Sequence, residues 1–191
     1  MTVGRSMKVF VSGGCKNGKS SWAEQWVSEQ SGDGRPLYYL ATMLPKDDED
    51  HARVARHKAS RAHIPFTTLE LARDFDQLIE AIDTGAIDAE GVFLLDSTTA
   101  LLENEMFTAD GDFNPNAAAK VIQHLELLLA RLDRIIIVSD YLFSDALFYT
   151  ADLTDHYRMA LAEVDRSLAR QCDRVIEVSF GCVTIHKGAR I

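Results

Sequence analysis

The sequence of 191 residues has few cysteines and no long hydrophobic run. Its three cysteines, Cys15, Cys172 and Cys182, form no CxxC pair and cannot all pair with one another, which favours a reduced, cytoplasmic protein. No apolar stretch approaches the ~20 residues that a membrane-spanning helix needs. The first residues, MTVGRS, lack the apolar core of a signal peptide. The sequence therefore predicts a cytoplasmic protein without a membrane span.

Positive charge is also scarce in this chain. The sequence has 20 Lys and Arg against 29 Asp and Glu, with a net charge of −9 at pH 7. This balance argues against a general nucleic-acid partner, because such partners require a broad basic surface. The basic residues that are present concentrate at 53–61. That local concentration predicts a small anionic ligand beside this segment.

No internal repeat, low-complexity tract or proline-rich linker divides the chain, which has only four prolines. A hydrophobic fraction of 47% and a charged fraction of 26% are typical of a globular protein. We therefore predict a short N-terminal extension at 1–6 and one nucleotide-binding catalytic domain at 7–191. Whether the natural start is Met1 or Met7 stays open.

Short apolar runs alternate with longer amphipathic stretches along the chain. The predicted strands are 7–12, 37–41, 66–70, 92–96, 135–139, 175–179 and 182–186, of which 66–70 is the weakest. The predicted helices are 19–31, 48–62, 74–83, 99–107, 116–131 and 155–171. Several strands are apolar on both faces, as in a covered parallel sheet. Alternation of strand and helix predicts a three-layer α/β fold with a mostly parallel sheet, and the last two strands predict an edge hairpin.

One motif in the sequence predicts phosphate binding. Residues 13–20, GGCKNGKS, match G-x-x-x-x-G-K-[ST] between a predicted strand and a predicted helix, the context of a P-loop. The backbone N–H groups of such a loop and the positive end of its helix hold phosphate oxygens. Lys19 is expected to reach the β- and γ-phosphates, and Ser20 to bind Mg²⁺. The predicted nucleotide contacts are Gly13, Gly14, Cys15, Lys16, Asn17, Gly18, Lys19, Ser20 and Ser21.

A P-loop also requires a second acidic Mg²⁺ ligand at the end of another strand. Asp96 ends VFLLD and Asp140 ends IIIVSD. Either carboxylate can instead cap the helix that follows it. We favour Asp96, because a polar Ser-Thr-Thr turn follows it at the edge where ligands bind in open α/β sheets.

A second candidate site lies at ARVARHKASR, residues 52–61, where His57 stands among basic residues. Neighbouring cations disfavour the charged form of an imidazole, and a neutral imidazole can act as a nucleophile. Arg53, His57 and Arg61 are spaced by four residues and predict a shared exposed helix face, opposite a small-residue face of Ala52, Ala55, Ala59 and Ala62. The alternative is a surface histidine without a function. The preceding PKDDED is interpreted as helix capping rather than metal binding.

In order along the chain, GGCKNGKS, YLATM (39–43), ARVARHKASR, FTTLE (66–70) and LLDSTT (94–99) resemble the bifunctional adenosylcobinamide kinase/adenosylcobinamide-phosphate guanylyltransferase family of cobalamin biosynthesis. The matches span roughly residues 7–107, and the R-[IV]-x-x-H-[KR]-x-x-R element is the distinctive one. The resemblance implies ATP and GTP as substrates, a corrinoid acceptor, Mg²⁺ and a homo-oligomer, a trimer in relatives.

The resemblance also implies residue roles. His57 would receive GMP from GTP as a covalent phosphoramidate, with Lys19 and Asp96 as the other catalytic residues. Further nucleotide contacts carry over to Ala41, Thr42, Met43, Arg53, Lys58, Ala59, Ser60, Arg61, Glu70 and Asp96. Asp96 replaces the glutamate usual in the family, which keeps the charge and shortens the reach, and Ser20 and Asp96 are the expected metal ligands. Glu70 can also be an ordinary charge at a strand end.

The sequence departs from the family pattern in two places. Where the family commonly has Asn-Glu-Val-Gly after the fourth strand, this chain has SDYLFSDALFY at 139–149. Where the family has Gly-Arg-Pro after the histidine, this chain has Ser60-Arg61-Ala62. The first change leaves two alternatives open: a kinase without the guanylyl step or with another small alcohol as acceptor, and a nucleotide-binding regulator without turnover. For Tyr141, Leu142 and Phe143 we favour packing over contact with a bulky ligand.

Overall fold

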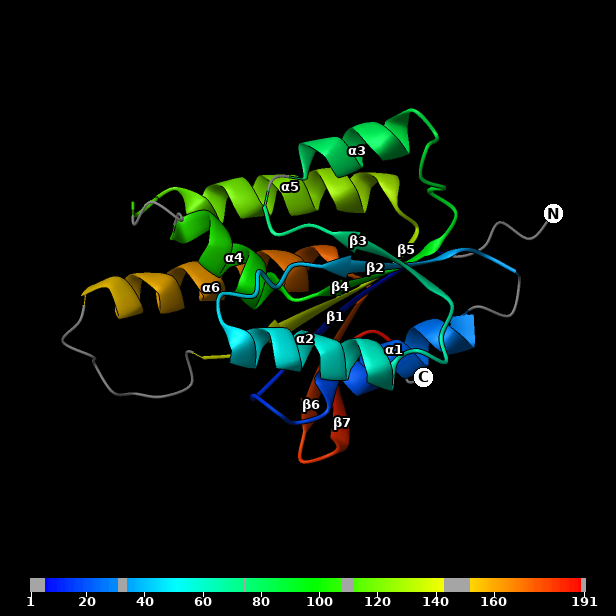
Figure 1. Ribbon diagram of the computed structural model, residues 1–191, viewed down its shortest axis with the longest axis horizontal. Coiled ribbons are helices and arrows are strands. Elements are labelled where there is room, and N and C mark those ends of the chain that lie inside the picture. The colour runs from blue at the N-terminus through cyan, green and yellow to red at the C-terminus, as the bar shows by residue number, and fades with distance from the viewer. Residues whose placement is uncertain (1–5, 31–33, 74, 108–111, 143–151, 190–191) are drawn as a thin grey trace.

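The structure, a computed structural model, describes residues 6–30, 34–73, 75–107, 112–142 and 152–189. Seven strands form one sheet in the order β3-β2-β4-β5-β1-β6-β7 (Figure 1). The strands are β1 Met7–Gly13, β2 Leu37–Ala41, β3 Phe66–Glu70, β4 Val92–Asp96, β5 Arg134–Asp140, β6 Arg174–Ser179 and β7 Cys182–Lys187. The helices are α1 Lys19–Gln30, α2 Asp48–Ser60, α3 Asp76–Asp83, α4 Thr98–Met106, α5 Ala117–Arg131 and α6 Asp152–Gln171. All neighbouring strands are parallel except β6 and β7, so the predicted α/β fold with an edge hairpin is confirmed.

Two apolar clusters cover the two faces of the sheet. On one face, Phe10, Leu40 and Leu95 pack with residues of α3, α4, α5 and α6. On the other face, Val9 and Val11 pack with residues of α1. Figure 1 shows these layers, with α1 and α2 on one side of the sheet and α3 and α5 on the other. On α6, a stripe of residues at helical spacing lies in the first cluster or packs against it: Tyr157, Leu161, Val164, Leu168 and Cys172.

The caps explain where the helices next to the predicted sites begin. Asp47 caps α2 by accepting a hydrogen bond from Asp50 N at 2.8 Å, which confirms capping as the role of the acidic run. Ser97 caps α4 in the same way from Ala100 N. α2 ends at Ser60, two residues before the predicted end, and α6 begins at Asp152, three residues before the predicted start.

The predicted exposure of Arg53 and His57 on α2 is confirmed, whereas that of Arg61 is wrong. Ala52, Ala55 and Ala59 are exposed, and α2 has no buried residue. The alanines share one face of the helix, but residue size does not determine which face packs. Instead, Arg61, the residue that ends the helix, is 6% exposed. Its guanidinium carbon lies 3.7 Å from the centroid of the Tyr39 ring, so a cation–π contact holds this end of the helix.

Within the described ranges, no helix is long and apolar enough to cross a membrane.

Candidate active site

The loop between β1 and α1 has the backbone that the GGCKNGKS motif predicts. Gly18 has φ +88°, a conformation that side chains rarely adopt, and Lys16 has φ +59°. Gly13 packs against β6 so closely that an added Cβ would lie 2.2 Å from the carbonyl oxygen of Val178. The loop is therefore held against the sheet at its first glycine, while α1 begins directly at Lys19.

Lys19 is buried, at 5% exposure, and its ammonium group is held from two sides. Its Nζ donates to Asp140 Oδ1 at 2.6 Å and to the carbonyl oxygen of Gly14 at 2.8 Å. An ammonium group has three N–H donors, so one donor is left for a ligand. The ion pair with Asp140 therefore fixes the position of the Lys19 ammonium group beside the P-loop.

The two acids considered from the sequence lie in one cleft, in different environments. Asp96 Oδ2 accepts a hydrogen bond from the Tyr39 hydroxyl at 2.8 Å. Ser97, not Asp96, caps the helix that follows, so the alternative role of Asp96 as a helix cap is wrong. Asp140 pairs with Lys19, and its backbone N–H donates to Thr99 Oγ1 at 2.9 Å. The strand order places β5 between β4 and β1, which brings both acids to the P-loop.

The cleft has a volume of about 750 Å³ and joins the P-loop to α2. His57 lies on its wall, on the exposed surface of α2. Basic side chains of the same helix and its cap, including Arg53, Arg56, Lys58 and Arg61, line the cleft with it. The cleft thus contains a phosphate-binding loop, two carboxylates and a cluster of cations around one histidine.

Most residues predicted from the sequence meet in this cleft. The predicted residues that line it are Cys15, Lys16, Asn17, Gly18, Lys19, Ser20, Ser21, Ala41, Met43, Arg53, His57, Lys58, Arg61, Glu70 and Asp96. Five predicted contacts, Gly13, Gly14, Thr42, Ala59 and Ser60, are not among the lining residues described. The Thr42 side chain is buried and exchanges two 2.7 Å hydrogen bonds with the backbone of Ser97, so it holds the strand ends together.

The prediction that Arg61 shares an exposed helix face with Arg53 and His57 is wrong. It lines the cleft from a buried position, whereas Arg53 is exposed and bound to Asp50 Oδ1 at 3.0 Å. The helical spacing failed here because α2 ends at Ser60 and Arg61 has left the helical conformation. Lys58 and Glu70, both predicted contacts, form an ion pair of 2.9 Å across the cleft edge.

Tyr39 is one of several lining residues that sequence reasoning missed; the others described are Pro45, His51, Val54, Arg56, Ser97, Thr99, Ala100, Glu103 and Val138. In a strand, side chains alternate between faces, so Tyr39 shares a face with Ala41, which was predicted. This alternation could have predicted from the sequence that Tyr39 lies in the site with Ala41. Asp140 was recognised but placed second to Asp96 because of the polar turn after Asp96, and its contact with Lys19, 121 positions away, could not be read from local sequence.

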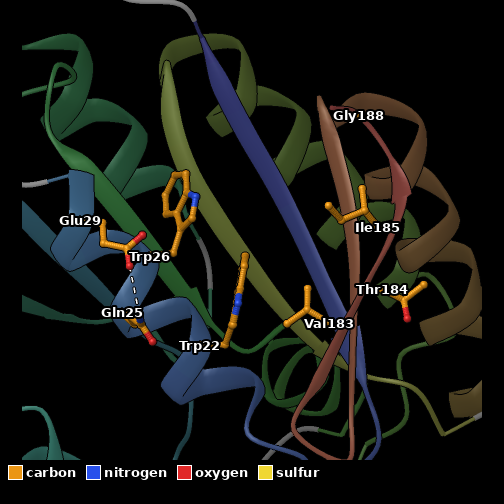
Figure 2. Close-up of a pocket in the computed structure, with 8 residues that line it drawn as sticks. All are labelled: Trp22, Gln25, Trp26, Glu29, Val183, Thr184, Ile185 and Gly188. Atoms are coloured by element: carbon orange, nitrogen blue, oxygen red, sulfur yellow. Dashed lines mark hydrogen bonds between the residues drawn. The ribbon is translucent and has the colours of Figure 1, made fainter. Parts of the chain in front are cut away.

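A second groove, of about 840 Å³, lies between α1 and the edge strand β7 (Figure 2). Its lining residues are Trp22, Gln25, Trp26, Glu29, Val183, Thr184, Ile185 and Gly188. Gln25 and Glu29 bind each other at 3.0 Å. This groove is slightly larger than the cleft, but none of the predicted site residues lines it. The cleft, with its grouped cations and carboxylates, is therefore the candidate active site.

The oxygen donors in the cleft suit Mg²⁺, which shares its ligands with phosphates and water. They do not suit a metal ion that is held by protein side chains alone. Among the residues described, no group of three or more His, Cys, Asp or Glu side chains could hold a metal ion. Mg²⁺ prefers oxygen ligands and usually takes one or two from the protein and the rest from phosphates and water. Ser20 and Asp96 both line the cleft and supply such oxygens.

A family model described as cobinamide kinase / cobinamide phosphate guanyltransferase matches residues 9–185. The chain belongs to this family. Residues 9–185 include the P-loop, α2 and both acids, so the candidate active site lies wholly inside the family match.

Two relatives in the cobinamide kinase / guanyltransferase family are named bifunctional adenosylcobalamin biosynthesis protein CobU. The Salmonella typhimurium protein is 31% identical over 186 residues, which is 92% of this chain and 97% of that protein. The Escherichia coli protein is 34% identical over 110 residues, so the match spans 58% of this chain and about half (56%) of that protein.

Solved structures resemble the chain in fold alone. The KaiC-like protein PH0186 from Pyrococcus horikoshii OT3 has a TM-score of 0.55 and 11% identity, over 97% of this chain and 81% of that one. A solved ATPase domain has a TM-score of 0.53 and 13% identity, over 91% of this chain and 69% of that one. These likenesses agree with the α/β fold and its mostly parallel sheet.

Tyr141, in the described part of the segment that departs from the family pattern, lies next to the P-loop. Tyr141 is fixed there, since its N–H donates to Gly13 O at 3.2 Å and its hydroxyl donates to Glu177 Oε1 at 3.2 Å. The packing interpretation therefore describes Tyr141 but not Leu142, which is 41% exposed. Phe143 lies outside the described residues.

A buried acid lies behind the cleft. Asp165 of α6 is 5% exposed, and in the part of the chain that the structure describes neither its carboxylate oxygens nor Ser139 Oγ has a hydrogen-bond partner. Burial raises the pKa of Asp165 to about 7, the charge of Asp140 adds to this, and the Ser139 hydroxyl beside it opposes it. The carboxyl group is therefore protonated in the folded protein up to near-neutral pH.

Asp165→Asn is expected to stabilise the protein at pH 8 and to have little effect at pH 4. Because the folded-state pKa is raised, the folded protein keeps a proton that the unfolded chain loses above about pH 4. The wild type therefore loses stability as the pH rises from about 4 to 7, by about 4 kcal/mol at most for one such group. Asparagine cannot ionise, so the variant lacks this dependence of stability on pH.

Urea unfolding at pH 4, 6 and 8 measures this effect. Glu163→Gln is the matched control, since Glu163 lies on the same helix and is exposed. Equal differences between Asp165→Asn and the wild type at all three pH values would contradict the assignment.

Proposed function

We propose that this chain catalyses two successive steps of cobalamin biosynthesis. It phosphorylates adenosylcobinamide with ATP or GTP, and it then transfers GMP from GTP through His57 to adenosylcobinamide phosphate. The observation that carries the proposal is the single cleft lined by both the P-loop and the His57 helix in a member of this family. A kinase alone has no need of a histidine among cations opposite its P-loop.

In the first reaction, the acceptor hydroxyl oxygen attacks the γ-phosphorus and loses its proton to solvent. The bond from the γ-phosphorus to the β,γ-bridging oxygen breaks, and the nucleoside diphosphate leaves. The P-loop N–H groups and Lys19 hold the triphosphate and stabilise the charge that develops on it. Asp140 and the carbonyl oxygen of Gly14 fix the Lys19 ammonium group at 2.6 and 2.8 Å, so its position is set before a ligand arrives. Such preorganised charge requires no rearrangement during the reaction.

Ser20 and Asp96 are the residues that would hold Mg²⁺. When bound, Mg²⁺ neutralises charge on the β- and γ-phosphates. Asp96 is prepared for this role by the Tyr39 hydroxyl, which holds one of its carboxylate oxygens at 2.8 Å and leaves the other available.

In the second reaction, a lone pair of the neutral His57 imidazole attacks the α-phosphorus of GTP. A P–N bond forms, the bond to the pyrophosphate oxygen breaks, and pyrophosphate leaves. A phosphate oxygen of adenosylcobinamide phosphate then attacks the same phosphorus, the P–N bond breaks, and His57 is restored. Arg53, Lys58 and Arg61 line the cleft around His57 and would stabilise the charge at the attacked phosphorus.

The way α2 is attached supports the use of one cleft for two reactions. The helix has no buried residue and is held near its C-terminal end, by Arg61 on Tyr39 and by the ion pair between Lys58 and Glu70. Elements with few buried apolar contacts change position at low free-energy cost. Such a helix can place His57 near the α-phosphate in one reaction and withdraw it in the other.

The proposal also concerns partners and location. We expect a cytoplasmic enzyme that assembles with copies of itself, as the family resemblance implies. Sedimentation of the purified chain measures the assembly. Analysis of nucleotide consumption with ATP or GTP measures the donor preference.

The experiment that tests the proposed function supplies adenosylcobinamide and separates the corrinoid products. With ATP alone, we expect the phosphate ester. With GTP added, we expect the GDP-linked corrinoid and release of pyrophosphate. Formation of the ester without the GDP-linked product would leave a kinase only, and nucleotide binding without any corrinoid product would indicate a regulator.

A further inference from the structure

Tyr39 contacts both halves of the candidate active site with different parts of one side chain. Its hydroxyl donates to Asp96 Oδ2 at 2.8 Å, beside the P-loop. Its ring carries the Arg61 guanidinium, whose carbon lies 3.7 Å from the ring centroid. Tyr39 lines the cleft and is only 5% exposed, so both contacts are formed at a buried position in the cleft.

The contact between Tyr39 and Arg61 attaches the end of the helix that bears His57 to the sheet at a buried position. Arg61 ends α2, and α2 itself has no buried residue. The Arg61 guanidinium is buried on the Tyr39 ring, and its side chain lines the cleft together with Asp96. A guanidinium stacked on an aromatic face has a defined position.

We propose that Tyr39 is a positioning residue that couples the two reactions, with its hydroxyl orienting Asp96 and its ring orienting Arg61 and the C-terminal end of the His57 helix. The inference rests on the proposed function and assigns to Tyr39 a role in each step.

A purely structural role for Tyr39 makes different predictions. The ring packs edge-on against Phe66, with centroids 5.6 Å apart, and belongs to the apolar cluster under α1. If packing were its only role, removal of the hydroxyl would change nothing in either reaction. The neighbouring Tyr38 provides a matched control, because its ring stacks on Phe93 and its hydroxyl accepts from Asp88 N at 3.2 Å, away from the cleft.

The experiment compares Tyr39→Phe, Tyr39→Leu and Tyr38→Phe with the wild type. Tyr39→Phe keeps the platform for Arg61 but frees Asp96, so we expect phosphoryl transfer to fall about 10- to 100-fold, as for other residues that orient metal ligands. Labelling of His57 by α-labelled GTP at saturating Mg²⁺ should be unchanged. Tyr39→Leu should impair both reactions. Tyr38→Phe should impair neither.

Two readouts do not depend on turnover. Calorimetric titration of GTP with and without Mg²⁺ should show a weaker effect of Mg²⁺ in Tyr39→Phe than in the wild type. Hydrogen exchange at the C-terminal amides of α2 should be faster in Tyr39→Leu and unchanged in Tyr39→Phe. Wild-type behaviour of both Tyr39 variants in these two measurements would overturn the inference.

The outcomes separate this inference from the proposed function. A wild type that forms no phosphorylated corrinoid and no labelled His57 would overturn the proposed function, and the titration and exchange measurements would still decide the role of Tyr39. A fully active wild type with fully active Tyr39 variants would overturn the role of Tyr39 alone.

Discussion

Lys19→Ala is expected to lower kcat/KM for phosphoryl transfer to adenosylcobinamide on the order of 10³-fold or more. Lys19 is the cation that the P-loop presents to the triphosphate, and its ammonium group is fixed by Asp140 at 2.6 Å and by Gly14 O at 2.8 Å. Charge stabilisation by a group held in this way acts mainly in the transition state. We therefore expect most of the loss in kcat. Initial rates at varied nucleotide and acceptor concentrations measure it.

The substitution also leaves the Asp140 carboxylate without its partner, so stability has to be measured alongside activity. The double variant Lys19→Ala/Asp140→Asn removes the uncompensated charge and should restore the melting temperature but not the activity. Lys8→Ala, at the other end of β1, is the control and should have normal rates. Near-normal phosphoryl transfer by a folded Lys19→Ala protein would contradict the role of the P-loop lysine.

His57→Ala is expected to abolish guanylyl transfer and to leave phosphoryl transfer intact. Loss of the attacking nitrogen removes the covalent route, and losses on the order of 10⁴-fold or more follow removal of a nucleophile. Phosphoryl transfer should continue because its groups belong to the P-loop and the strand ends. The measurement is acid-labile label on the protein after incubation with α-labelled GTP, followed by the yield of GDP-linked corrinoid.

The other histidines near α2 make the assignment specific. His63→Ala, just beyond the helix and outside the residues that line the cleft, should keep the label. His51 lies on the same helix and lines the same cleft, so mapping of the labelled peptide must separate the two. Label on His51, or label that persists in His57→Ala, would contradict the proposed nucleophile.

Local patterns were sufficient for the elements and for the nucleotide-binding motif. Alternation of apolar runs with amphipathic stretches predicted the seven strands and six helices, because each pattern reflects the period of one element and which of its faces is covered. The GGCKNGKS motif could be recognised because its chemistry depends on residues within one short turn. The resemblance of five ordered motifs led to the family that the comparisons show.

Contacts between distant parts of the chain could not be predicted in this way. Sequence reasoning compared Asp96 and Asp140 only as Mg²⁺ ligands or helix caps, yet Asp140, 121 residues from Lys19, binds that lysine. It placed Arg61 on an exposed face, yet Arg61 is buried on Tyr39, a residue of another element. These choices depend on which strand ends are neighbours and on where α2 ends, and both are properties of the packed sheet.

The amino-acid sequence by itself determined the strands and helices, the phosphate-binding loop and the family, because each of these is encoded in residues close to one another in the chain. Only the tertiary structure decided which acid holds Lys19, which residue anchors the His57 helix and that Tyr39 contacts both parts of the cleft. Those decisions depend on distances between elements, which follow from the strand order and from the packing of side chains across the sheet.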